Sequence, residues 1–237
     1  MRMVSKHADI LRSVDRFGQL SSAHIQQLYF PTAKSRTSFA RPAKQLVEEG
    51  FLVRMGQRQV RGHGKGSGPA VYQLGVAGWH YLGKRGKFRP RFTAVSEHRL
   101  RVADVFAQLC EREDRGEIKV QGYYCEPDTH RPLAGVTVRP DFFVELELTD
   151  KSELVSLWIE VDRDNESRLE IEKKIREYVA VFDGVRPGEI ETVPSVLFLA
   201  ETDIGLRNLQ GYMHGKLGAY EHMFELMHIE GFADKVK

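Results

Sequence analysis

The sequence predicts a mixed α+β protein of two domains, the first mainly helical and the second of α/β type. A chain of 237 residues with 41% hydrophobic residues can bury one substantial core and a smaller second one. The apolar pattern changes from helical spacing near the start to strand-like runs after residue 117. The charge also reverses, because residues 1–96 carry 17 Lys and Arg against 4 Asp and Glu, whereas residues 97–237 carry 18 against 29.

Three helices are predicted in the first 50 residues. "HADILRSVDRFG" repeats apolar residues at helical spacing, and "LSSAHIQQLYFP" offers Ser21 or Ser22 as the N-cap of a short helix that Pro31 ends. "TAKSRTSFARPAKQLVEEGFL" predicts a third helix. Pro42 removes one helical hydrogen bond, so this helix either kinks there or begins later than the segment does.

A basic hairpin is predicted to follow the third helix. "FLVRMGQRQV" and "AVYQLG" have the composition of strands, and the glycine-rich "RGHGKGSGP" separates them. Three helices followed by such a hairpin predict a winged helix-turn-helix over residues 1–83. The basic, Pro- and Gly-containing segment 84–93 is then a linker to a second domain at 94–237.

The distribution of charge in this half predicts a polyanionic partner, which we expect to be double-stranded DNA. Residues 51–96 contain nine Lys and Arg and no acidic residue, although a basic linker that only aids solubility is the alternative. In a winged helix the third helix enters the major groove and the hairpin follows the DNA backbone. The candidate DNA-binding residues are Lys34, Arg36, Arg41, Lys44, Arg58, Arg61, Lys65, Lys84, Arg85 and Lys87.

The second half predicts the element order α-β-β-β-α-β. A long helix in "AVSEHRLRVADVFAQLCERED" precedes the strands "IKVQGYY", "RPDFFVELEL" and "LVSLWIEVD". Asn165 or Ser167 caps the next helix, and "PSVLFLA" is a uniformly apolar, buried strand. "IGLRNLQGYMHGKLGAYEHMFELMHIEGF" predicts further helix.

Carboxylates mark the ends of the second and third strands. Asp141 opens one strand, and Glu160 and Asp162 close the next, where the two-residue period of a strand places both on one face. Such side chains either converge on a metal ion or cap the following helix. Glu145 and Glu147, which alternate with apolar residues, predict a solvated face.

The second half resembles the PD-(D/E)xK nuclease fold, also called restriction-endonuclease-like. The resemblance rests on the order of elements, on Pro140 and Asp141 at the start of one strand, and on "IEVD" at the end of the next. The whole chain, from about Val4 to Met213, is similar to the replication-relaxation family of plasmids and mobile elements, on "RPDFFVEL", "WIEVDRDNES" and "KKIREY". This resemblance implies a DNA-binding protein of plasmid or phage origin that supports replication and DNA relaxation.

The resemblance also implies a site. In a PD-(D/E)xK centre an Asp and a Glu bind Mg²⁺ and a lysine orients the attacking water, which implies Asp141 and Glu160 as ligands for Mg²⁺ or Mn²⁺. Asp162 occupies the lysine position and adds a carboxylate ligand. Lys173 or Lys174 would then be a displaced lysine, and Glu97 a fourth ligand. An active Mg²⁺-dependent nickase, a degenerate metal-binding fold and an unrelated interaction domain all remain open.

Other classes of protein fit less well. The sequence contains no GxSxG, Walker-type loop or HExxH, and Cys110 and Cys125 lack the spacing of a zinc site. No apolar run reaches roughly 20 residues, so we expect a cytoplasmic protein without a membrane partner. A relaxase, a replication initiator or a second copy of the chain are the expected protein partners. A winged-helix transcription regulator with a dimerisation or sensing domain is the alternative function.

Overall fold

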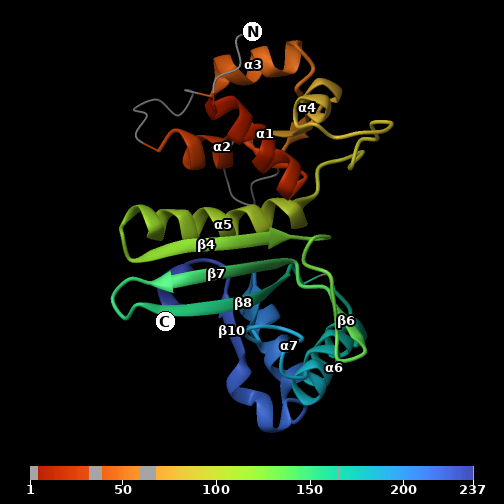
Figure 1. The fold of residues 1–237 in the computed structure, drawn as a ribbon, viewed down its shortest axis with the longest axis vertical. Coiled ribbons are helices and arrows are strands. Elements are labelled where there is room, and N and C mark those ends of the chain that lie inside the picture. Colours follow the sequence, from red (N-terminus) through yellow and green to blue (C-terminus); the bar gives the residue numbers. More distant parts are fainter. Residues whose placement is uncertain (1–4, 32–38, 59–67, 165, 237) are drawn as a thin grey trace. The chain divides into compact units, whose positions relative to one another are not determined.

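The computed structural model describes residues 5–31, 39–58, 68–164 and 166–236, and these divide the chain into two compact units. The N-terminal unit is residues 1–107 and the C-terminal unit is residues 108–237, so the division falls inside helix α5 (Glu97–Asp114). Figure 1 shows the elements of both units. The predicted mixed α+β class is confirmed.

The N-terminal unit contains four helices before α5 and one small antiparallel sheet among its described residues. Ser21 is the N-cap of α2, where its hydroxyl accepts the His24 N–H, and the His24 side chain in return accepts the Ser21 N–H. The sheet has the order β1-β3-β2. In chain order the elements are α1 (Ser5–Phe17), β1 (Leu20–Ser21), α2 (Ser22–Tyr29), α3 (Ala40–Glu48), β2 (Leu52–Gln57), β3 (Ala70–Leu74) and α4 (Val76–Tyr81).

Helix α3 begins late, as one of the two alternatives for Pro42 requires. With Ala40 as the first helical residue, Pro42 lies in the first turn, where a backbone N–H has no intrahelical acceptor. Helix α4 is an element that the sequence did not predict. A side chain at Gly75 or Gly78 would lie about 2.2 or 2.3 Å from the carbonyl oxygens of Gly50 and Phe51, so these glycines allow α4 to pack closely against the start of β2.

Residues 84–93, all of them described, form neither helix nor strand. Two buried glutamines nevertheless attach this region to the N-terminal unit. The Gln73 side chain donates to the Phe92 carbonyl at 3.1 Å and accepts the Phe92 N–H at 3.2 Å. Gln19 bonds in the same way to Ala94 and Ser96, at 2.8 Å each. The C-terminal end of this segment is therefore held to the N-terminal unit.

The C-terminal unit is built on a five-stranded mixed sheet of order β10-β9-β8-β7-β4. Strands β4, β7 and β8 are antiparallel neighbours, and β9 and β10 continue the sheet in parallel. After α5 the elements are β4 (Ile118–Cys125), β5 (Arg131–Leu133), β6 (Val136–Val138), β7 (Phe142–Leu148), β8 (Glu153–Asp162), α6 (Arg168–Gly184), β9 (Ser195–Ala200), α7 (Asp203–Met213), the 3-10 turn η1 (Gly218–Met223), β10 (Phe224–His228) and the 3-10 turn η2 (Ala233–Lys235).

The predicted α-β-β-β-α-β order is present, with the small hairpin β5–β6 inserted before β7. The prediction of helix through the last part of the chain is wrong. Helix α7 ends at Met213, and Gly215 and Gly218 then adopt positive φ angles of 70° and 57° that a continuing α-helix does not allow. The chain returns as strand β10, parallel to β9 at the sheet edge.

Helix α6 covers one face of this sheet. Ser167 is its N-cap, accepting the Glu170 N–H. The helix packs Ile171, Ile175, Tyr178 and Val181 against Trp158, Val196 and Phe198 of the sheet. The last six residues of β8 are all buried, because β8 is the central strand. Glu160 is carried into the interior by that position.

A partly buried ion-pair cluster lies in the N-terminal unit, around Arg58 at the end of β2. The Arg58 guanidinium donates to both oxygens of Asp104 at 2.7 and 2.5 Å, and His24 Nε2 lies 2.7 Å from Asp104 Oδ1. Burial alone would raise the pKa of Asp104, but the bonds from Arg58 and His24 outweigh it and hold that pKa well below its usual value.

We predict that Arg58→Ala lowers the free energy of unfolding by about 1 to 3 kcal/mol at pH 7, because it leaves the partly buried Asp104 without its main cation. A carboxylate with a depressed pKa stabilises the fold above its unfolded pKa, and this contribution is lost as pH falls through the folded pKa. The difference from the wild type should therefore narrow below about pH 4 in urea titrations. Lys44→Ala, which removes an exposed pair with Glu48, is the control. Equal effects of the two changes would contradict the prediction.

Candidate functional site

The carboxylates of Asp141 and Glu160 lie close together where β7 begins and β8 ends. Asp141 immediately precedes β7, and the pairing of Phe142 with Ile159 brings it beside Glu160 near the end of β8. Both side chains are buried, with exposed fractions of 7% and 2%. The Asp141 carboxylate accepts the N–H of Val161 at 2.9 Å, which fixes it across the two strands. The predicted approach of these two residues is thus present.

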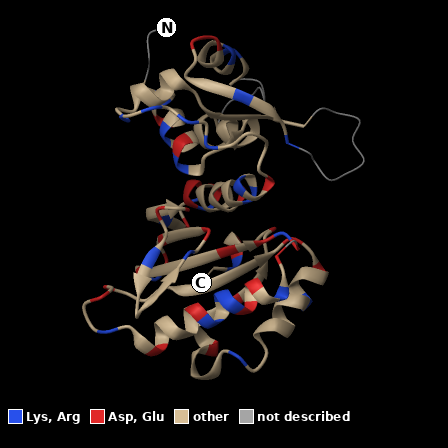
Figure 2. Cartoon of the chain, turned by 90° about the vertical axis from the view of Figure 1, so that its right-hand side faces the viewer, with Lys and Arg blue, Asp and Glu red and all other residues tan. Residues whose placement is uncertain are grey.

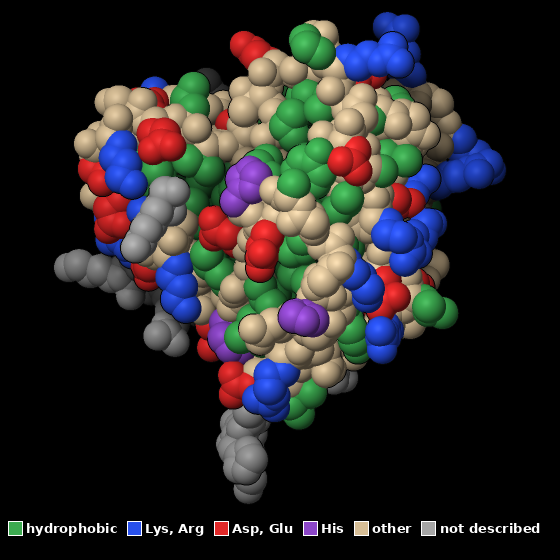
Figure 3. Space-filling view, turned by 90° about the horizontal axis from the view of Figure 1, so that it is seen from below, with side chains coloured by type: hydrophobic (Ala, Val, Ile, Leu, Met, Phe, Trp, Pro, Cys, Tyr) green, Lys and Arg blue, Asp and Glu red, His purple; other side chains and the backbone are tan. Residues whose placement is uncertain are grey.

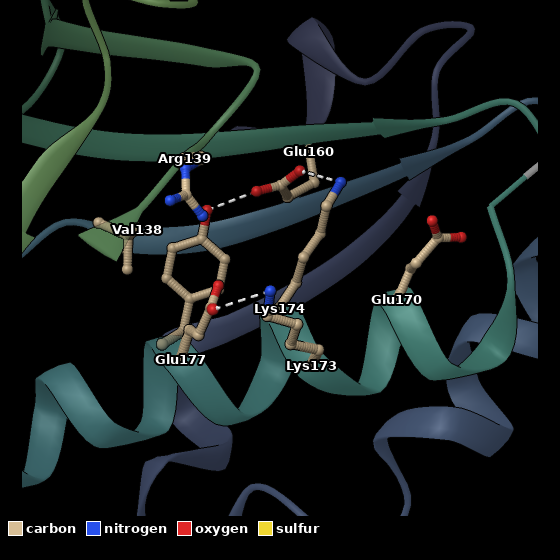
Figure 4. Close-up of a pocket in the computed structure, with 8 residues that line it drawn as sticks. Val138, Arg139, Glu160, Glu170, Lys173, Lys174 and Glu177 are labelled. Carbon is tan, nitrogen blue, oxygen red and sulfur yellow. Dashed lines mark hydrogen bonds and ion pairs between the residues drawn. The ribbon is translucent and has the colours of Figure 1, made fainter. Parts of the chain in front are cut away.

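Helix α6 supplies partners to both oxygens of Glu160 (Figure 4). Lys174 Nζ donates to Oε2 at 2.8 Å, and the Tyr178 hydroxyl donates to Oε1 at 2.5 Å. Lys174 also donates to Glu166 at 2.8 Å. Because residues four apart share one face of a helix, the spacing of Lys174 and Tyr178 lets both side chains hydrogen-bond to the same carboxylate.

These groups alter one another's protonation. Burial, and then the charge of Asp141, raise the pKa of Glu160, while Lys174 and Tyr178 oppose that rise. Burial lowers the pKa of Lys174, but the surrounding carboxylates Glu160, Asp141 and Glu166 outweigh it and raise that pKa above its ordinary value. The site therefore holds a protonated lysine among carboxylates that need a cation.

Asp162 is engaged elsewhere. Its carboxylate accepts the N–H of Asp164 at 3.0 Å, and burial raises its pKa to about 6. Within the described ranges, no three His, Cys, Asp or Glu side chains form a group that could hold a metal ion. Asp141, Glu160 and Asp162 are thus not brought together as three metal ligands, although Asp141 and Glu160 are brought together as two.

A cavity of about 150 Å³ opens beside Glu160. Figure 4 shows Arg139 reaching it from the end of β6 and Lys174 from α6. Lys173 also lines it but pairs with Glu177 at 3.7 Å, so of the two candidate lysines only Lys174 contacts Glu160. The lining residues are Val138, Arg139, Glu160, Glu170, Lys173, Lys174, Glu177 and Tyr178.

Tyr178 and Arg139 are site residues that were not predicted from the sequence. Tyr178 reads as one more apolar position on the inner face of α6, and Arg139 as an ordinary charge before a strand. The helix segment "KKIREY" contained the signal, because Lys174 and Tyr178 are separated by one helical turn. Only the pairing of β8 beneath α6 turns that spacing into a site.

Glu97 and Arg58 have structural partners within the N-terminal unit. Arg58 Nε lies 3.3 Å from Glu97, in addition to its two bonds to Asp104. Glu97, expected as a fourth metal ligand, is thus paired with arginine. The Arg58 side chain, expected on DNA, is 12% exposed and held by carboxylates.

The remaining basic candidates differ in how far they are engaged. Arg41 and Lys44 lie on the exposed side of α3, and Arg85 and Lys87 are exposed in the segment after α4. Lys84 pairs with Asp15 at 2.6 Å and lies over the Trp79 ring. Lys34, Arg36, Arg61 and Lys65 fall outside the described residues.

Acidic and basic side chains are interspersed on the C-terminal unit. They alternate along its helices (Figure 2) and mix over the face seen in Figure 3. On α6 the pairs Arg168–Glu172 and Lys173–Glu177 contribute to this pattern. In the part of the chain that the structure describes, no helix combines the length and apolar character needed to cross a bilayer.

The raised pKa of Asp162 leads to a prediction that can be tested without metal. A folded-state pKa of about 6 means that ionised, buried Asp162 destabilises the fold above that pH and not below the ordinary pKa near 4. Asp162→Asn should therefore raise the free energy of unfolding at pH 7.5 by about 1 kcal/mol, after allowing for solvent screening, and change it little at pH 4. Melting temperatures at the two pH values measure this difference. Asp150→Asn, in an exposed turn, is the control. A gain that is the same at both pH values would show that burial of this charge is not the cause.

The profile of the replication-relaxation family matches residues 11–196, which include all the elements from α2 to α6 together with the carboxylates and lysine of the candidate site. No curated protein and no solved structure matches significantly. The family description indicates a role in replication and relaxation. With more than three quarters of its length matched, the chain belongs to the replication-relaxation family.

Proposed function

We propose that this protein binds double-stranded DNA through its N-terminal unit, as a winged helix-turn-helix, and acts on that DNA through a PD-(D/E)xK-type centre in its C-terminal unit. The centre would take Mg²⁺ or Mn²⁺ and nick DNA during replication or relaxation of a plasmid or phage. The observation that carries the proposal is the convergence of Asp141, Glu160 and Lys174 on one buried point.

The order of elements around that point supports the proposal. Helix α5, the antiparallel strands β4, β7 and β8, helix α6 and the parallel strand β9 follow the order of the nuclease fold that the sequence resembles. Asp141 precedes the second of these strands and Glu160 lies near the end of the third, at the motif positions. Since one fold serves many functions, the side chains matter more than the topology.

The donor set fits a hard divalent cation. Mg²⁺ commonly binds proteins through one or two carboxylates and completes its shell with water and substrate phosphate oxygens. Asp141 and Glu160 are such a pair, and Asp162 is not needed for it. When bound, the metal would polarise the phosphate and lower the pKa of a bound water.

The protein's own side chains have separate tasks in this centre. Tyr178 and Lys174 fix the two oxygens of Glu160, so the carboxylate keeps one orientation. Lys174 occupies, from a helix, the role that the lysine of "ExK" has on the strand, where this chain has Asp162. Arg139 and Lys173 also line the adjoining cavity, where Glu170 and Glu177 offset their charge.

In the N-terminal unit the exposed face of α3 supports DNA binding. Arg41 and Lys44 are exposed on this helix, and β2 and β3 form the antiparallel hairpin expected after a recognition helix. Arg58 is not among the proposed contacts because Asp104 and Glu97 hold it.

The metal proposal predicts that millimolar Mn²⁺ raises the melting temperature of the protein, because the ion binds the folded state only. Glu160→Gln should abolish this rise and reduce nicking of supercoiled DNA about 100-fold or more, as expected when a catalytic metal loses a ligand. Tyr178→Phe should weaken Mn²⁺ binding several-fold, since Oε1 of Glu160 loses its donor.

Tyr220→Phe is the matched control, since it removes a tyrosine hydroxyl that donates to Asp183, a carboxylate of α6 outside the site. Mn²⁺ titrations by calorimetry measure affinity, and agarose gels measure nicking. A wild-type melting temperature that does not change with Mn²⁺ or Mg²⁺ would rule out the proposed metal centre.

The DNA proposal predicts that Lys44→Ala weakens duplex binding on every sequence and reduces the slope of log K against log salt by about 1, because one phosphate contact is lost. Arg41→Ala should instead change the preference among sequences, by about 1 to 3 kcal/mol at the affected base. Fluorescence anisotropy with labelled duplexes measures both. Lys151→Ala, in an exposed turn of the C-terminal unit, should behave as the wild type, and indistinguishable binding by all variants would remove α3 from the interface.

A further inference from the structure

A groove of about 790 Å³ lies on the face of the sheet that α6 covers only in part. Strands β4, β7 and β8 form its floor. The turn before β5, β5 itself and the segment 190–192 line its sides. Neither the proposed DNA contacts nor the Glu160 centre uses this groove, so it requires its own explanation.

The strand register arranges the floor in three rows. Tyr124, Phe143 and Trp158 form an aromatic row, in which the rings of Tyr124 and Phe143 lie 6.0 Å apart and Trp158 is buried. The next row is Gly122, Glu145 and Ser156, and the third is Lys119, Glu147 and Leu154, of which Lys119 does not line the groove.

The middle row makes the floor hollow and negative. Gly122 and Ser156, which flank Glu145 on the neighbouring strands, have small side chains. The Glu145 side chain therefore projects above them, beside the aromatic row. Glu145 is exposed, and among the described residues no cation pairs with it. Its carboxylate therefore remains available in the groove.

The sides of the groove are also mainly acidic. Asp128 and Glu191 line the groove from opposite segments, and Glu147 on the floor accepts from Gln121. Arg131 is the single basic residue of the lining. The groove thus combines four carboxylates with exposed apolar surface, since Tyr124 is 46% and Leu154 69% exposed.

We propose that this groove binds an extended, arginine- or lysine-bearing peptide segment of a partner protein. Aromatic faces attract guanidinium and ammonium groups, and neighbouring carboxylates pair with them, so the two features select the same cationic side chain. Leu154 provides an apolar contact for the intervening residue. From Leu154 to Trp158 the floor spans about 13 Å, the length of four to five extended residues.

The same chemistry argues against nucleic acid as the occupant. An aromatic platform can stack bases, but binding of a strand also needs a positive groove along its phosphates, and here the carboxylates repel them. The peptide site is therefore distinct from the DNA-binding face of the protein, and it would let the DNA-bound protein recruit a basic partner.

The test uses the full chain and a fluorescein-labelled pentapeptide of alternating arginine and leucine, with binding measured by anisotropy. Wild-type protein should bind this peptide, and Glu145→Gln and Tyr124→Ala should each weaken binding about fivefold or more. Glu153→Gln is the matched control, because Glu153 is an exposed carboxylate of β8 outside the groove. It should leave the affinity unchanged.

Two further probes separate the peptide from other occupants. A pentapeptide with glutamate in place of arginine should not bind, and a labelled oligothymidine should be unaffected by Glu145→Gln and Tyr124→Ala. Equal affinity of the wild type, Glu145→Gln and Glu153→Gln for the arginine peptide would overturn the proposal, as would binding of the glutamate peptide. Oligothymidine binding that Tyr124→Ala abolishes would make the groove a nucleic-acid site instead.

Discussion

Glu160 has to be neutralised at the point where the sheet and α6 enclose it, and much of the C-terminal unit is arranged around that need. An ionised carboxylate with 2% exposure and Asp141 as its neighbour is strongly unfavourable without donors. Helix α6 satisfies it by presenting Lys174 and Tyr178 from successive turns, while the inner side of the same helix packs on Trp158 and Phe198. Packing and charge therefore fix one position of α6 together.

A similar balance explains why the basic half of the chain is less uniformly basic in space than in sequence. Part of its positive charge is used internally, as Arg58 with Asp104 and Lys84 with Asp15 show. Arg41 and Lys44 of α3 differ from these, because they lie on the exposed side of a helix whose opposite side is buried. A count of charges along the chain does not separate the two kinds of residue.

Local signals in the sequence were sufficient for much of the fold. The caps Ser21 and Ser167, the alternation of "DFFVELEL" and the apolar "PSVLFLA" each depend on interactions a few residues apart, so their helices and strands were predictable. Asp141 and Glu160 followed from the same pattern. Tyr178 and the engagement of Arg58 could not be predicted, because each depends on a partner that only the tertiary fold brings near. Strand β10 was missed for the same reason, since parallel pairing with β9 decides its conformation.

The mixed sheet also has a consequence for the order in which the C-terminal unit assembles. Strands β7 and β8 are joined by a short turn and pair as neighbours, whereas β8 and β9 pair only after the chain has passed through α6. Local pairings form faster than those that close long loops. The hairpin would thus bring Asp141 and Glu160 together before Lys174 arrives. Docking of α6 then supplies Lys174, the cation that the two neighbouring carboxylates require in the folded sheet.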